Sequence, residues 1–174
     1  MKILLEDLDV YAYRLGLPKW STILMTFLYP ATWAIGVYRF GNWIVIKCKT
    51  PVIKHTLFLL YFILKRISEI LTGIEIANNA EIGKGLSIGH LSGIIIGHGS
   101  KIGDYSSFHQ GVTIDGAGRE ENHGSPTIGN CVYFGAGAKV IGKINVGNNV
   151  KIGANTVVVK NVSDNSTVAG LLQR

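Results

Sequence analysis

The chain has 174 residues, which is enough for one compact domain or for a repeat array with a cap. Hydrophobic residues make up 47% and charged residues 16%, and the mean hydropathy is +0.29, so an intrinsically disordered chain is excluded. The net charge of +6 comes from dispersed Lys and Arg without a basic stripe, which argues against nucleic-acid binding and suits a polyanionic small ligand or an anionic membrane surface.

The N-terminus, MKILLEDLDVY, has neither the apolar stretch nor the small-residue cleavage site of a secretory signal. The two cysteines, Cys48 and Cys131, lack CxxC or Cys/His ligand spacing, so neither a disulfide framework nor a zinc site is expected. We therefore predict a cytoplasmic protein that requires no metal.

Two apolar stretches lie within a predicted helical segment over residues 1–73. The first, residues 20–38, is a run of 19 residues without a formal charge, long enough for a spanning helix to be considered, but it contains Pro30. The second, residues 56–64, is too short to span. Three interpretations stay open: packing within the chain or within an oligomer, peripheral contact with the inner face of the membrane, and spanning.

From residue 74 onward, aliphatic or aromatic residues recur every six positions, and most are followed by a small residue. This period matches neither a helix nor a simple alternating strand, but it fits a triangular coil in which each unit makes one flat side and a corner. We predict a mainly β fold, a single-stranded left-handed parallel β-helix over residues 74–170, with a short tail over 171–174. The inward positions are Ile76, Ile82, Ile88, Ile96, Ile102, Phe108, Ile114, Ile128, Phe134, Val140, Val146, Ile152 and Val158.

The six-residue phase breaks at two places. Ile88 and Ile96 are eight residues apart, and this interval contains His90. Ile114 and Ile128 are fourteen residues apart, and this interval contains a polar loop. Because each break pushes backbone out of a rigid wall, both are candidate site elements.

At these residues the sequence resembles the serine acetyltransferases and related hexapeptide-repeat O-acetyltransferases, including capsule and exopolysaccharide acetyltransferases. The matching segments are IEIANNAEIGKGLSIGHLSGIIIG, HQGVTIDGAG, TIGNCVYFGAGAKVIGKINVG and VKIGANTVVVKNV. The resemblance implies an acetyl-CoA-dependent enzyme that assembles as a homotrimer, or as a dimer of trimers, with its sites between subunits. It further implies that His90 is the general base and that Glu75, where serine enzymes typically have Asp, orients it.

Acetyl transfer from a thioester to an alcohol suits these residues. A neutral histidine, with an unperturbed pKa of about 6.5, can accept the proton of the attacking hydroxyl. A carboxylate on its other nitrogen fixes the tautomer and stabilises the imidazolium. Since no covalent enzyme intermediate is required, we expect direct transfer. The backbone amides of Gly116, Ala117 and Gly118 can stabilise the oxyanion, unless this turn is only a flexible exit from the coil.

The coenzyme is expected to lie along the stack of repeats. The resemblance points to Ala136 and Ala154, whose amides would bond the pantetheine arm, and their spacing of 18 residues puts them on successive turns. Lys151 and Lys160 can meet its phosphates, or they can be solvated corner charges.

The acceptor is expected to be a hydroxyl-bearing small molecule or a saccharide. His109, which can face the same cleft as His90, and His123 and Arg119, on the polar loop, are its candidate binding residues.

Two departures from the serine enzymes bear on the acceptor. Their Arg-His pair in the loop is replaced by Gly124 and Ser125, and residues 14–18 have no carboxylate to hold an amino group. We therefore favour the hydroxyl of a sugar or polysaccharide precursor. Serine O-acetylation for cysteine biosynthesis is the alternative, and a non-catalytic β-helix scaffold is a third interpretation.

Overall fold

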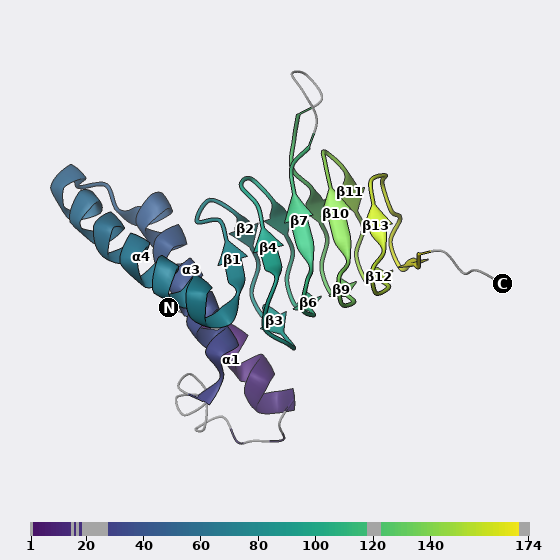
Figure 1. The fold of residues 1–174 in the computed structure, drawn as a ribbon, viewed down its shortest axis with the longest axis horizontal. Coiled ribbons are helices and arrows are strands. Elements are labelled where there is room, and N and C mark those ends of the chain that lie inside the picture. The colour runs from purple at the N-terminus through teal and green to yellow at the C-terminus, as the bar shows by residue number, and fades with distance from the viewer. Residues whose placement is uncertain (1, 15, 17, 19–27, 118–122, 171–174) are drawn as a thin grey trace.

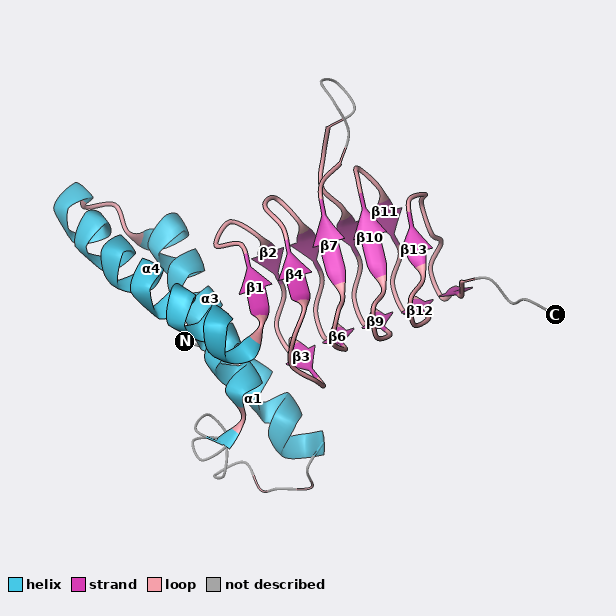
Figure 2. Ribbon diagram, in the orientation of Figure 1, coloured by secondary structure: helices cyan, strands magenta, loops and turns pink. Residues whose placement is uncertain are grey.

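The computed structural model describes residues 2–14, 16, 18, 28–117 and 123–170, so the tail 171–174 and much of the first apolar run lie outside the description. Helices gather at one end of a long β-coil, and the C-terminal end of the coil points away from them (Figure 1, Figure 2). The helices are α1 (Lys2–Arg14), α3 (Pro30–Lys47) and α4 (Pro51–Thr72). No described helix is long and apolar enough to cross a membrane.

Proline and glycine set the helix boundaries. Pro30 and Pro51 occupy the first turns of α3 and α4, where the missing N–H costs nothing. Gly73 ends α4 in the left-handed conformation, with φ of 65°, and the first strand follows directly. The two helices pack side by side, and Gly41 of α3 faces the ring of Tyr61 so closely that a Cβ there would clash.

The coil has three parallel sheets, one on each side of a triangle. Face A contains β1 (Ile74–Ile76), β4 (Ile94–Ile96), β7 (Thr113–Asp115), β10 (Lys139–Ile141) and β13 (Val157–Val158). Face B contains β2 (Glu81–Ile82), β5 (Lys101–Ile102), β8 (Thr127–Ile128) and β11 (Asn145–Val146). Face C contains β3 (Ser87–Ile88), β6 (Ser107–Phe108), β9 (Tyr133–Phe134), β12 (Lys151–Ile152) and β14 (Thr167–Val168).

The interior of the coil is filled by the six-periodic positions, all of which are buried. On face A the parallel register aligns Ile76 with Ile96, Ile96 with Ile114, Ile114 with Val140, and Val140 with Val158. The register therefore stays in step across both phase breaks. The structure confirms the predicted left-handed parallel β-helix, with helices at its N-terminal end.

The helices also satisfy the backbone of the first coil turn, which has no preceding turn to pair with. The Tyr11 hydroxyl donates to the Ile88 carbonyl at 3.1 Å and accepts from the Ile88 N–H at 2.8 Å. The Tyr38 hydroxyl donates to the Ala80 carbonyl at 2.8 Å and accepts from the Ile82 N–H at 3.2 Å. Because an open strand edge invites pairing with another chain, these tyrosines cap the coil.

A buried ion pair joins α1, α3 and the coil. Arg39 Nε donates to Asp7 Oδ2 at 2.9 Å, and the Leu86 N–H donates to Asp7 Oδ1 at 2.8 Å. The same guanidinium donates to the Ile82 carbonyl at 2.6 Å. Burial raises the pKa of the Asp7 carboxyl above its usual value, and the hydrogen bond and charge of Arg39 oppose that rise.

Candidate active site

The border where face C turns into face A, here the C–A corner, brings two of the candidate histidines together. His90 lies in the turn after β3, and His109 follows β6 on the next turn of the coil. Their ring centroids are 5.4 Å apart. Gly89 lies beside the His109 ring: a Cβ there would be 3.7 Å from His109 Cε1, an ordinary van der Waals contact.

The sequence analysis missed Tyr133, which completes this cluster. Its ring lies 5.2 Å from that of His109 in an edge-on arrangement. The pattern held a usable signal, because Tyr133 directly precedes the inward residue Phe134 and must point outward. We call His90, His109 and Tyr133 the histidine corner.

Backbone hydrogen bonds to α4 and to the next turn of the coil hold the first phase break, residues 89–95, and so fix the turn that carries His90. The Ser92 N–H donates to the Thr72 carbonyl at the end of α4, at 2.9 Å. The Ser92 carbonyl accepts from the Gly111 N–H of the next turn, also at 2.9 Å. Ser92 itself has a positive φ of 81°, a conformation rare for a residue with a side chain. The imidazole of His90 is thereby held at the surface.

Glu75 lies outward on β1, aligned with Ile95 of β4, and is exposed. Within the described residues its carboxylate has no hydrogen bond or ion pair. The single chain thus offers Glu75 on face A and His90 at the adjoining corner without joining them, and their pairing remains a prediction.

Ala136 and Ala154 stack on the same C–A corner as the histidines. The Asn155 N–H donates to the Ala136 carbonyl at 2.8 Å, and the Gly137 N–H donates to the Gln110 carbonyl at 2.8 Å. No backbone acceptor within the described chain takes the N–H of either alanine. An elongated ligand along this corner would meet both amides after passing His109.

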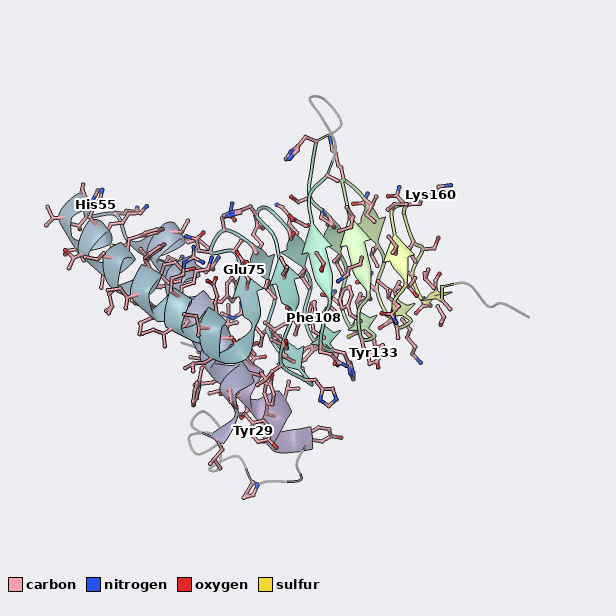
Figure 3. All side chains as sticks on the ribbon, viewed as in Figure 1. Tyr29, His55, Glu75, Phe108, Tyr133 and Lys160 are labelled. Atoms are coloured by element: carbon pink, nitrogen blue, oxygen red, sulfur yellow. The ribbon has the colours of Figure 1, made fainter. Side chains whose placement is uncertain are left out.

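The two candidate phosphate-binding lysines, Lys151 and Lys160, lie on opposite sides of face A. Lys151 is exposed and lies outward on β12, in register with Tyr133 of β9, so it is on the face that adjoins the histidine corner. Lys160 follows β13 at the border between faces A and B, the A–B corner, on the opposite side of face A (Figure 3).

The polar loop also leaves at the A–B corner, after β7, and its described base points away from the coil on the side opposite β3 (Figure 1). Its base is closed by two hydrogen bonds of 3.1 Å between the backbones of Ala117 and Gly124. The Gly116 N–H donates to Asp115 Oδ1 at 2.8 Å. His123 is exposed. Gly118 and Arg119 lie outside the described residues. Within one chain, therefore, Gly116, Ala117 and His123 do not meet His90.

A further cavity lies elsewhere. It is a mainly apolar groove of about 930 Å³ between α1, α3 and face B, lined by side chains that include Ile3, Phe40 and Trp43. The histidine corner does not line it. No cluster of three or more His, Cys, Asp or Glu side chains in the described ranges is placed to hold a metal ion.

No family model matches the chain. A serine acetyltransferase of Helicobacter pylori is 40% identical over 152 residues, which cover 87% of this chain and 82% of the relative. A serine acetyltransferase of Synechococcus elongatus is 39% identical over 143 residues, and there the match spans only 55% of the relative.

Solved structures give the same picture. The crystal structure of Neisseria gonorrhoeae serine acetyltransferase superposes with a TM-score of 0.80 at 29% identity, covering 99% of this chain and 63% of that one. Soybean serine acetyltransferase also superposes with a TM-score of 0.80, at 26% identity, over 99% of this chain and 67% of that one.

Proposed function

Because the chain belongs to the serine acetyltransferase family, we propose that it transfers the acetyl group of acetyl-CoA to a hydroxyl group, with serine as the acceptor. The observation that carries the proposal is the C–A corner. An exposed imidazole, His90, lies there beside His109. The amides of Ala136 and Ala154, for which the described residues provide no backbone acceptor, continue along the same line.

In the proposed reaction, His90 accepts the proton of the acceptor hydroxyl as its oxygen attacks the thioester carbonyl carbon. The new C–O bond leaves negative charge on the carbonyl oxygen, which backbone N–H groups stabilise. The C–S bond then breaks, and the imidazolium returns its proton to the departing thiolate. Glu75 is proposed to orient His90, and Lys151 is placed to meet a phosphate of the coenzyme.

We further propose that the site forms between two copies of the chain in a homotrimer. Loop and histidine lie on opposite borders of face A, so one copy cannot bring its Gly116 and His123 to its own His90. A neighbouring copy can present its loop there. The proposed location is cytoplasmic.

The saccharide acceptor remains the second candidate, although the relatives favour serine. One observation supports it. The Ser125 hydroxyl is held at 2.6 Å by the carbonyl of His98, and a Cβ at Gly124 would crowd the stem of Lys143. Positions 124 and 125, where serine enzymes carry their Arg-His pair, thus supply no cationic side chain of their own for an amino acid's carboxylate, although the stem of Lys143 lies against Gly124.

An acceptor comparison tests the proposal. The protein is incubated with acetyl-CoA and either L-serine or a panel of mono- and oligosaccharides, and release of the coenzyme thiol is followed. We expect serine-dependent release. Release with saccharides alone would transfer the assignment to the second candidate, and no release with any acceptor would favour the scaffold interpretation.

A further inference from the structure

Helix α4 exposes an apolar face along most of its length. Large aliphatic side chains recur on one side of it at helical spacing, with exposed fractions between 48% and 83%. We call this set the apolar face of α4; it consists of Leu59, Leu60, Ile63, Ile67, Ile70 and Leu71.

The chain's own core lies on the other side of this helix. Tyr61, Ser68 and Thr72 are the buried residues of α4, and they face α3 and the start of the coil. Figure 3 shows the side chains of α4 that project away from α3 standing clear of the coil. The apolar face is therefore surplus to the fold of the single chain, and exposed patches of this kind mark interaction sites.

Charge identifies the occupant. Residues 30–72, which hold α3 and α4, contain six Lys or Arg and a single acidic residue, Glu69, which gives +5; since Arg39 is paired with the buried Asp7 of α1, +4 remains. Lys47 and Lys49 are exposed at its distal end. Arg66 lies at the edge of the apolar face with its side chain 58% exposed, whereas Lys65 lies on the side of α3; both contact Glu69, at 2.7 Å and 3.3 Å.

A second copy of the chain fits this pattern poorly, because pairing two apolar faces would bring two strongly positive hairpins together, and like charges across an interface are costly. An anionic bilayer attracts the same charges, and it accepts an apolar helix face at the boundary between headgroups and acyl chains. With its 22 residues α4 is about 33 Å long, at 1.5 Å per residue, and can lie flat.

We propose that α4 docks the protein onto an anionic lipid bilayer, with its apolar face in the acyl boundary and with Arg66, Lys47 and Lys49 among the headgroups. The surface is separate from the histidine corner, so the proposal holds whichever acceptor is used. It goes beyond the proposed acetyl transfer, and its test reads membrane binding instead of activity.

Vesicle co-sedimentation tests the proposal. The full chain is mixed with phosphatidylcholine vesicles and, separately, with equimolar phosphatidylcholine–phosphatidylglycerol vesicles. We expect binding to the anionic vesicles that weakens with added salt. The double variant Leu59→Glu/Ile63→Glu should lower the partition coefficient by about tenfold or more, because it puts charge into the acyl boundary.

Matched variants make the result specific. Val159→Glu alters an equally exposed aliphatic residue, 58% accessible, at the far end of the coil, and should leave binding unchanged. Ile70→Glu, at a side chain 83% exposed, tests the same face with little risk to folding. Lys47→Gln/Lys49→Gln should reduce the preference for anionic vesicles.

Light scattering on the same protein samples measures their mass and tests the competing occupant, a second copy of the chain. If the parent protein ignores anionic vesicles and the Leu59→Glu/Ile63→Glu variant has a smaller mass, the face joins copies of the chain and the proposal is wrong. Equal vesicle binding by the parent and by the folded Ile70→Glu variant would also overturn it.

Discussion

His90 is exposed because the first coil turn is longer than the six-residue period requires. The extra backbone cannot enter the closed wall, so it bulges at the C–A corner, where Thr72 and Gly111 hold it through Ser92. His109 approaches the same ring from the next turn, because the coil stacks equivalent corners. The residue with the proposed chemistry thus sits on a strained but doubly anchored turn, which is how many reactive side chains are held.

Replacing His90 tests its role as the base. His90→Ala should lower kcat by about 10²- to 10⁴-fold, because the acceptor hydroxyl would have to lose its proton to water. The measurement is thiol release at saturating acetyl-CoA and serine. His55→Ala, at an exposed histidine on α4, is the control and should retain full activity. A His90→Ala enzyme as fast as its parent would contradict the assignment.

The ion pair between Asp7 and Arg39 predicts a large stability effect. The Asp7 side chain is fully buried and that of Arg39 is 11% exposed, so Asp7→Ala would leave an unpaired buried cation, at a cost of about 3–5 kcal/mol. Urea unfolding of both single variants and of the double variant measures the coupling.

An exposed pair supplies the control for that measurement. Lys101 and Glu81 are 3.1 Å apart with side chains 56% and 64% exposed, so Glu81→Ala should cost less than about 1 kcal/mol. If Asp7→Ala and Glu81→Ala lowered the free energy of unfolding equally, the buried ion pair between Asp7 and Arg39 would not hold the helices to the coil.

At the scale of elements, the α3–α4 hairpin depends on close contact at Gly41, where the Tyr61 ring takes the place of a side chain. The second glycine of α3, Gly36, has open space around it. Two chemically identical changes in one helix therefore have opposite expected effects.

Gly41→Ala should destabilise the protein by about 1–3 kcal/mol, since the added methyl group forces the tyrosine ring aside. Gly36→Ala should be neutral or stabilising by up to about 1 kcal/mol, because alanine favours the helix. Thermal and urea unfolding of both variants provide the comparison. Equal destabilisation of both would mean that the contact with Tyr61 is not what requires glycine in α3.

The β-coil could be predicted from the sequence, but the hydrogen bonds by which the helices cap its first turn could not. The six-residue period from Ile76 to Val158 fits a triangular β-coil with one inward residue per repeat, and these inward residues were predicted correctly. The hydrogen bonds of Tyr11 and Tyr38 to the first turn depend on where the helices dock, and no local pattern specifies that. The separation of the loop from His90 was open to prediction, because counting faces along the repeat puts the first break before face A and the second after it.

At the scale of the whole molecule, that separation makes assembly part of the proposed chemistry. The C–A corner of one copy carries His90, and the A–B corner carries the base of the loop from Ala117 to Gly124. A site that needs both must draw them from two copies, as closed rings of identical subunits allow.

Subunit complementation tests this arrangement. A His90→Ala chain and a chain lacking residues 118–122 should each be inactive. Mixed oligomers formed by co-refolding equal amounts should regain about one quarter of the parent activity, because that share of random interfaces pairs an intact histidine with an intact loop. Serine-dependent thiol release is the measurement. No recovery in verified mixed oligomers would place the whole site within one chain.

The pair of hydrogen bonds that closes the base of the loop has one more consequence. Since β7 and β10 keep their alignment although the loop intervenes between them, the register of the coil is set up to Ala117 and resumes from Gly124. Segments of other lengths and compositions can be grafted there without disturbing the wall. Acceptor preference in such a chain can drift rapidly over evolutionary time while the donor-binding architecture stays unchanged.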